Sequence, residues 1–456
     1  MPGGRRVNAD TLNSNPSGPI ESNRSARCTP ETVPETNYAS LTGVKKTMNV
    51  LRSTIARRQA GKPNRHAFTL VELLVVIAVI GVLVGLAIPA IARARRTAIA
   101  SAMKAEVTNI ENGINSYNTK YGDYPPDMMS WPIVRRHYLK IFPDIAQSEL
   151  NLLFRLGDTL PDNDANQMSA ISALTWNGAV LDRAEAVVWN LGGFSSDPQY
   201  PFTGSGGPLL IVDPAVSREN PLNVEYNPSR VAPIVEFEAS RLSLVAKDPS
   251  VVGSRYLSLD DDLLGNDVFP TYVLREGQSP IVYFDSRTYR FNAGDEASLD
   301  PEVRYLFNAY ARTTSDTPSG FDAIRPVVSI NPGKNAPSGT YDTAASALTA
   351  WLFENPRTFQ VLAPGLDGLY GGVSDSDLGA DASNAPPVYW QSSGQLVDTG
   401  LAGSVSTPAE LLARTPGGAL IQRFDVTGLS GFGVSGNPFQ DNICNFLSGT
   451  FIDSIE

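Results

Sequence analysis

The sequence predicts an α+β protein in which a long N-terminal transmembrane spine helix packs on a globular head with an antiparallel sheet and large insertions. Three features support this fold class. An apolar segment covers 68–88, a helical repeat of apolar residues continues to 121, and short β-rich runs divided by turns fill 207–295. We therefore divide the chain into a disordered or mis-assigned extension at 1–47, a basic leader at 48–67, the spine helix at 68–121 and an extracytoplasmic globular head at 122–456.

The apolar segment is long enough to cross a membrane. From Phe68 to Pro89 it reads FTLVELLVVIAVIGVLVGLAIP, with Thr69 and Glu72 as its only polar side chains. About 20 helical residues span about 30 Å, the thickness of the hydrocarbon core. A buried core helix is disfavoured because the run is not amphipathic. A plain secretory signal cleaved after 90–92 is disfavoured because the run exceeds the usual length of about 7–15 residues and contains Glu72.

The charges on either side of the segment predict its orientation. Residues 1–67 hold 11 Lys and Arg against 4 Asp and Glu, a net charge of +7. Positive flanks remain in the cytoplasm, so we expect a single pass of the inner membrane with the N-terminus cytoplasmic and the head periplasmic or extracellular. Arg93, Arg95 and Arg96 follow the segment on the far side, but the leader is expected to dominate.

Glu72 is the anomaly of the apolar segment. A carboxylate within a membrane is costly, and such a residue is by default a functional hypothesis with a partner to be named. If the chain is cut between Ala67 and Phe68, the new α-amino group lies four residues from Glu72. That amine, or one from a neighbouring subunit, could neutralise the carboxylate when subunits dock. The alternative is that Glu72 sits at the interface and extends toward water.

These features resemble the N-terminus of type IV pilins and of the pseudopilins of type II secretion. This chain reads His66-Ala67 and then Phe68-Thr69-Leu70-Val71-Glu72-Leu73, with Pro89 at the position that the family also gives to proline. The resemblance implies that prepilin peptidase cleaves between Ala67 and Phe68 and N-methylates Phe68, and that Glu72 guides assembly. One residue departs from the family pattern, because Ala67 stands where the family nearly always has Gly.

The helix is expected to continue beyond Pro89, which should bend it at the membrane exit. Apolar residues recur at helical spacing on one face, which should lie on the head. The breakers Gly122-Asp123-Tyr124-Pro125 end the pattern, and this exit resembles that of the major pseudopilin of type II secretion. The residues of the apolar face are Ile99, Met103, Val107, Ile110, Ile114, Tyr117 and Tyr121.

The head is predicted to mix helices and strands. Helical patterns occur at 133–145, 149–156 and 184–191, the last capped by glycines. β-Rich runs occur at 208–212, 231–237, 241–246, 272–274 and 281–291, and within the last of these we expect a hairpin that joins 279–284 to 288–291. His137 has no acid or cysteine beside it in the sequence, which favours a surface or core position over a catalytic one.

Two acidic loops are candidate calcium sites. Asp260 and Asp262 precede a Gly turn, although the loop lacks the later bidentate Glu of an EF-hand and a solvated acidic turn is favoured there. Asp367 lies in a Gly-rich stretch followed by Asp375 and Asp377, and this stretch resembles the calcium-binding loop of major pseudopilins. The alternative there is a Gly-rich tight turn. Residues 441–446 resemble a phrase that usually follows this loop directly, so we expect an insertion between them.

Composition excludes several function classes. The chain beyond residue 67 holds 25 Lys and Arg against 43 Asp and Glu, a net charge of −18, which disfavours a nucleic-acid binder. It retains one of the two cysteines, Cys444, so no intramolecular disulfide is expected, and a buried apolar setting is predicted for that thiol. We find no nucleophile–base pair and no His or Cys metal set, so we expect no enzyme.

The sequence therefore predicts a prepilin-type subunit of a type II secretion pseudopilus or related filament. The alternatives are a type IV (minor) pilus subunit or a membrane-anchored surface binding domain that does not polymerise. The expected partners are prepilin peptidase, other pilin-like subunits, the inner-membrane assembly platform and membrane lipid. Translation from Met48 would give a shorter basic leader.

Overall fold

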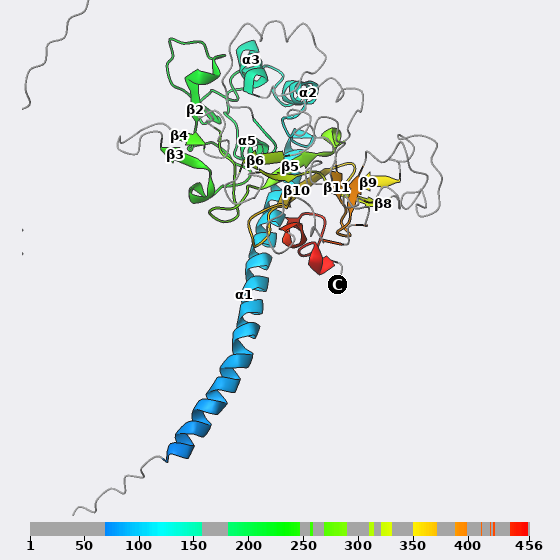
Figure 1. Ribbon diagram of the computed structural model, residues 1–456. Coiled ribbons are helices and arrows are strands. Elements are labelled where there is room, and N and C mark those ends of the chain that lie inside the picture. Colours follow the sequence, from blue (N-terminus) through cyan, green and yellow to red (C-terminus); the bar gives the residue numbers. More distant parts are fainter. Residues whose placement is uncertain are drawn as a thin grey trace, which may run out of the picture. The chain divides into compact units, whose positions relative to one another are not determined.

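The computed structural model describes residues 69–156, 181–246, 256–258, 269–289, 310–313, 321–330, 350–371, 388–398, 412, 420, 423–424 and 438–454. Contacts divide the chain into two units, residues 1–70 and residues 71–456, and the described fold belongs almost entirely to the second. Its helices are α1 (Leu70–Tyr121), α2 (Trp131–Ile141), α3 (Gln147–Leu156) and α5 (Glu185–Leu191) (Figure 1). Its strands are β1 (Leu209–Ile211), β2 (Val224–Tyr226), β3 (Leu244–Ala246), β4 (Tyr256–Ser258), β5 (Val282–Asp285), β6 (Tyr310–Thr313), β7 (Phe321–Ile324), β8 (Val328–Ile330), β9 (Trp351–Phe353), β10 (Phe359–Ala363), β11 (Val388–Trp390), β12 (Leu396–Asp398) and β13 (Ile443–Cys444).

Helix α1 has two halves with opposite surroundings. It runs for 52 residues, passes through Pro89 without a break and ends at Tyr121, where the sequence predicts its end. In the first half the apolar side chains are exposed, whereas in the second half Met103, Val107 and Ile110 are buried against the head. The predicted apolar face is confirmed, because Ile114 and Tyr117 are also buried. The second half of α1 is thus part of the head.

The predicted short helices are confirmed, with shifts of a few residues at their ends. Every residue of α5 is buried, including the polar Glu185 and Asn190. The end of α5 is held by Arg230, whose guanidinium donates to the carbonyl oxygens of Val188 and Trp189 at 2.6 Å each. The Val188 carbonyl also accepts from the Gly192 backbone N–H at 3.1 Å. The guanidinium adds a cation to these carbonyls and stabilises the helix C-terminus.

The central sheet has three antiparallel strands in the order β13-β10-β5. The other described strands form antiparallel pairs: β1 with β2, β3 with β4, β6 with β7, β8 with β9, and β11 with β12. Side chains alternate across the central sheet, so that Tyr283 and Val361 face the core beside α1 and α5, while Val282 and Leu362 face a second core. This sheet is therefore buried on both faces, and the α+β class is confirmed.

Within the described residues, which end at 289 here, the predicted hairpin is wrong. After β5 the chain forms a short 3₁₀ helix at Ser286–Thr288, and β5 pairs with β10, where Phe284 lies opposite Gln360. The side chain of Asp285 accepts a hydrogen bond from the Arg287 backbone N–H at 3.0 Å, which starts the turn locally. The run at 231–237 also forms no strand. Residues 234 and 235 instead donate their backbone N–H groups to Leu191 at the end of α5.

Candidate functional site

The first half of α1 presents a continuous apolar surface. Its large apolar side chains from Leu70 to Ile91 are all exposed, with exposed fractions from 45% at Val76 to 79% at Leu70. Within the described residues, α1 is the one helix long and apolar enough to cross a membrane, and none of its most apolar stretch is buried. A surface of this kind is costly in water and is satisfied by lipid or by other apolar helices.

The uncharged part of this surface matches a bilayer. No charged residue lies between Glu72 and Arg93, so the stretch Leu73–Ala92 contains 20 uncharged residues. At about 1.5 Å per residue this is about 30 Å, the thickness of the hydrocarbon core. A helix placed with this stretch in the core therefore has Glu72 at one boundary and Arg93 at the other.

The structure describes only some of the residues that the sequence predicts for processing and assembly. Glu72 lies in the first turn of α1 and is exposed, and a carboxylate is favoured there by the helix dipole. Pro89 lies within the exposed half of the same helix. Ala67 and Phe68 lie outside the described residues, so the cleavage site and the amine partner of Glu72 remain predictions.

The turn that follows α1 fastens the helix to the head. It covers residues 122–127, and side chains from three separate parts of the head hold each of its residues. The contacts are Lys140 Nζ to the Gly122 carbonyl (2.7 Å), Arg287 Nη1 to the Asp123 carboxylate (3.1 Å), Arg287 Nη2 to the Tyr124 carbonyl (2.9 Å), the Tyr283 hydroxyl to the Pro125 carbonyl (2.8 Å), Asn190 Nδ2 to the Pro126 carbonyl (3.1 Å) and Arg183 Nε to the Asp127 carboxylate (3.0 Å).

His137 is part of this fastening. Its ring is buried, with Nδ1 3.3 Å from the Asp123 carboxylate and Nε2 2.8 Å from the Tyr117 hydroxyl. A carboxylate only accepts hydrogen bonds, so Nδ1 carries the hydrogen and Nε2 accepts from Tyr117. The sequence interpretation that His137 has no acidic partner is wrong, because the fold brings Asp123 to it. The core position is confirmed.

Burial and charge oppose each other in this cluster. Burial would raise the pKa of Asp123, but the hydrogen bond from His137 and the charge of Arg287 lower it to about 2. Burial lowers the pKa of His137 below 6.5, although Asp123 opposes this shift. Burial raises the pKa of Asp285 to about 6, against the effect of its ion pair with Arg287. The arrangement is structural, because His137 and Asp285 have almost no exposed surface.

The family comparison matches the N-terminal segment. The model described as the prokaryotic N-terminal methylation motif matches residues 62–88, which include the predicted cleavage site and most of the exposed apolar surface of α1. This match supports a prepilin-type N-terminus like that of type IV pilins and pseudopilins. No curated protein and no solved structure matches the chain. The head, residues 122–456, lies outside the matched segment.

The head brings together the stretch around Asp367 and residues 441–446, which the sequence predicts to be parts of one region separated by an insertion. Strand β10 pairs with β13, so that Gly365 and Leu366 lie beside Asp441 and Asn442. Asp441 Oδ2 accepts from the Leu366 N–H at 2.7 Å, and Gly365 leaves no room for a Cβ, which would lie 2.2 Å from the Asp441 side chain. A tight turn follows, with Gly368 at φ +84°.

Of the aspartates predicted to bind calcium, this turn contains only Asp367. Asp367 is exposed, and its carboxylate accepts from the Leu369 N–H at 3.0 Å. Asp260, Asp262, Asp375 and Asp377 lie outside the described residues. In the described part of the chain, no group of three or more His, Cys, Asp or Glu residues is placed to hold a metal ion.

Sequence reasoning missed the residues that hold the exit turn. Arg183, Asp285 and Arg287 are far from residues 122–127 in the sequence, and no local pattern marks them as partners. The available signal was the charge of Arg183 beside the apolar α5 pattern, since a cation in a buried segment needs an anion.

Proposed function

We propose that this prepilin is a subunit of a type II secretion pseudopilus or a related filament. The observation that carries the proposal is the exposed apolar half of α1 at the methylation motif. A helix that crosses the membrane in the unassembled subunit can later pack against identical helices, because both settings satisfy the same apolar surface. The head, whose described surface includes no such apolar run, would remain outside the filament core.

Processing would prepare Glu72 for assembly. Cleavage between Ala67 and Phe68 creates an α-amino group close to the Glu72 carboxylate, and N-methylation leaves that amine basic. In an apolar helix bundle each charge is costly alone, so docking is favoured only where amine and carboxylate meet. This pairing would set the register between subunits. An assembly platform in the inner membrane would deliver each subunit to the filament. The proposed role is structural rather than enzymatic.

The decisive experiment is the intact mass and N-terminal sequence of the protein recovered from the native membrane. An N-methylated Phe68 terminus supports processing and the assembly role. A terminus at Met1 or Met48 means that Ala67 is not accepted and that the segment is only an anchor. A terminus at Arg93 means a plain secreted protein, and the filament proposal is then wrong.

An Ala67→Gly variant sharpens this measurement. Gly is the residue that the family has before the cut, so we expect the processed fraction to rise or to stay complete. Ala67→Leu should block cleavage, because a bulky side chain replaces a small one at the scissile bond. Equal processing of both variants would contradict the assignment of Ala67 and Phe68 as the cleavage site.

Calcium binding by the head is a second part of the proposal. Asp441 Oδ1 is buried and accepts no hydrogen bond from the described residues, and it lies at the same turn as Asp367. A buried carboxylate oxygen such as Asp441 Oδ1 suits a hard cation. The test is the melting temperature of the full chain with calcium and with magnesium. A rise with calcium that Asp375→Asn and Asp377→Asn remove supports the proposal, whereas no rise contradicts it.

A further inference from the structure

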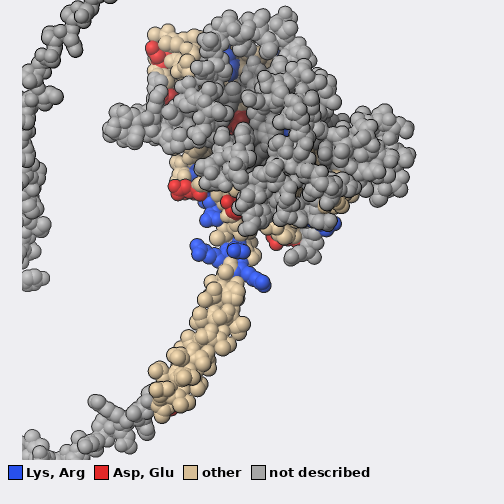
Figure 2. Space-filling model, in the orientation of Figure 1, with Lys and Arg blue, Asp and Glu red and all other residues tan. Residues whose placement is uncertain are grey.

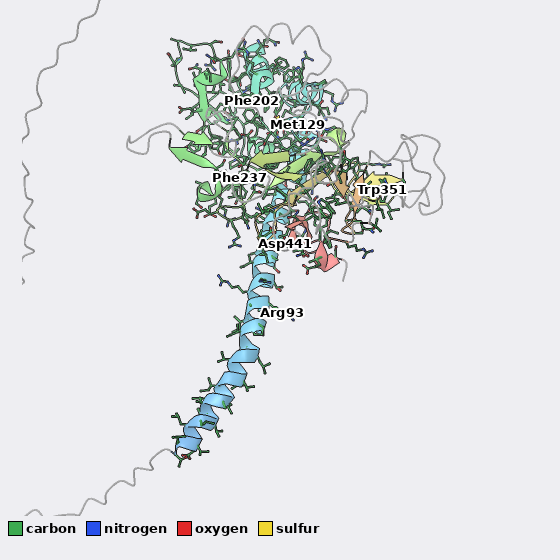
Figure 3. The ribbon with its side chains drawn as sticks, viewed as in Figure 1. Arg93, Met129, Phe202, Phe237, Trp351 and Asp441 are labelled. Atoms are coloured by element: carbon green, nitrogen blue, oxygen red, sulfur yellow. The ribbon has the colours of Figure 1, made fainter. Side chains whose placement is uncertain are left out.

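Three arginines form a positive cluster on the exposed part of α1. Arg93, Arg95 and Arg96, which we call the arginine cluster, are exposed and lie just past the uncharged stretch, as Figure 2 shows. Figure 3 shows Arg93 on the part of α1 that lies outside the head. None of the three forms an ion pair with a carboxylate of the described residues.

The sequence of α1 provides no partner for this cluster. Arginine is commonly paired with an acid three or four residues away on the same helix. Here the residues four positions away are Pro89 and Thr97 for Arg93, and all four corresponding positions for the other two arginines are Ile or Ala. The next acid after Glu72 is Glu106, which binds Arg241 and Tyr272 of the head. The three charges are therefore available to an external partner.

The position of the cluster fixes its depth in a membrane. When the 20 uncharged residues Leu73–Ala92 fill the hydrocarbon core, the next turn of the helix emerges at the level of the lipid phosphates. The three arginines occupy that single turn, because residues 93 and 96 are separated by only about 4.5 Å along the axis. The helix first becomes buried against the head beyond this point, at Met103. The head therefore leaves the cluster uncovered.

We propose that the arginine cluster binds the phosphodiester groups of anionic phospholipids in the leaflet next to the head. Guanidinium groups donate two parallel hydrogen bonds to phosphate oxygens, and their weak hydration suits the interface. The inference rests on the proposed membrane anchor. Positive charge on the far side of the segment opposes the orientation set by the leader, so orientation does not explain the cluster. A lipid-binding role does.

The distribution of the arginines favours lipid over a second copy of the chain. At 100° per residue the three side chains leave the helix over an arc of about 160°. A single neighbouring subunit meets one face of a helix, whereas a headgroup layer surrounds the helix at one depth. Three cations spread around the helix within one turn fit the layer better than the single face.

The test is native mass spectrometry of the full chain in detergent, titrated with phosphatidylglycerol and phosphatidylcholine that carry the same acyl chains. We expect the wild-type chain to retain phosphatidylglycerol about ten-fold more than phosphatidylcholine at low ionic strength, since each basic residue near an anionic surface contributes appreciably. The variant R93Q/R95Q/R96Q should lose this preference. The variant R93K/R95K/R96K should keep part of it, because it retains charge without the paired donors.

The matched control is R135Q/R136Q, which removes two exposed arginines from α2 and should leave the preference unchanged. Equal lipid retention by wild type and R93Q/R95Q/R96Q overturns the proposal. Displacement of the lipid by excess inorganic phosphate also overturns it, because the cluster would then be a site for soluble phosphate. Loss of self-association without a change in lipid retention would assign the cluster to a second copy instead.

Alkaline carbonate extraction of the membranes separates the two proposals. A chain that is extracted overturns the anchor and the lipid site together. A chain that stays integrated but shows no lipid preference overturns the lipid site alone.

Discussion

His137 is held neutral in the core of the head, and this makes folding sensitive to mild acid. Its folded pKa lies below the ordinary value of 6.5 because of burial. Between the two pKa values the unfolded chain binds a proton that the folded chain does not. Stability is therefore lost as pH falls below about 6.5. Asp285 has the opposite effect, because its folded pKa of about 6 lets the folded chain take up a proton first as pH falls toward 3.8.

We expect His137→Gln to remove the loss of stability as pH falls from about 7 to 5, because the amide can replace the hydrogen bonds but does not titrate there. The opposite contribution of Asp285 then remains. The measurement is chemical denaturation of the full chain in detergent at several pH values, followed by tryptophan fluorescence. The only other histidine is His66, so a His66→Gln variant is the control and should keep the wild-type slope. Parallel curves for wild type and His137→Gln would contradict this account.

Cys444 should be unreactive until the head unfolds. Its side chain is fully buried, and burial raises the pKa of the thiol from 9.0 to about 12. This raised pKa leaves almost none of the thiol as thiolate at pH 8, and only the thiolate reacts readily. In a Cys28→Ser chain we expect no labelling by a maleimide in native conditions and one label in denaturant. Rapid native labelling would show that the end of the chain around β13 opens easily.

At the scale of elements, α1 is close-packed against the head at Gly113. A Cβ there would lie 2.3 Å from a methyl group of Val235, and Val235 is itself held because its N–H donates to the Leu191 carbonyl at 3.1 Å. The side chain has little freedom to move away. The glycine is thus required by close approach of the helix to the segment after α5.

Gly113→Ala should destabilise the head by about 1–3 kcal/mol through overpacking, partly offset by about 1 kcal/mol of improved helix propensity. The matched control is Gly85→Ala on the same helix, where nothing lies within 4 Å of the new Cβ. The free energy of unfolding of the head, from denaturant curves, should fall for the first variant alone. A Gly113→Ala chain as stable as the control would mean that the contact relaxes without cost.

Elements set by local patterns were predictable, and those set by distant contacts were not. The helical spacing from Ile99 to Tyr121 predicts both the second half of α1 and its buried face, because period and burial are local properties. The prediction of a hairpin at 279–291 is wrong because β5 pairs with β10. The alternation of side chains along a strand does not specify which other strand will pair with it. The contacts of the turn at 122–127 could not be predicted for the same reason, since Arg287 lies 164 positions from Asp123 in the sequence.

For the whole molecule, the question is how a subunit that is stable in the membrane enters an assembly. The apolar half of α1 does not favour one setting over the other, because lipid tails and other apolar helices satisfy it similarly. A charged group can provide the difference, and Glu72 is the one acid in the segment. In the proposed filament its partner is the amine at Phe68.

Glu72→Gln should therefore separate anchoring from assembly. Insertion should remain or improve, because a neutral amide is less costly than a carboxylate in the membrane. Assembly should fall sharply, because removing one partner of a buried ion pair costs about 3–5 kcal/mol. The measurements are carbonate resistance and filament yield when the chain is expressed with its assembly machinery. Glu111→Gln, on the half of the same helix that packs against the head, is the control and should change neither carbonate resistance nor filament yield. Normal filaments from Glu72→Gln would mean that the carboxylate only extends to the interface.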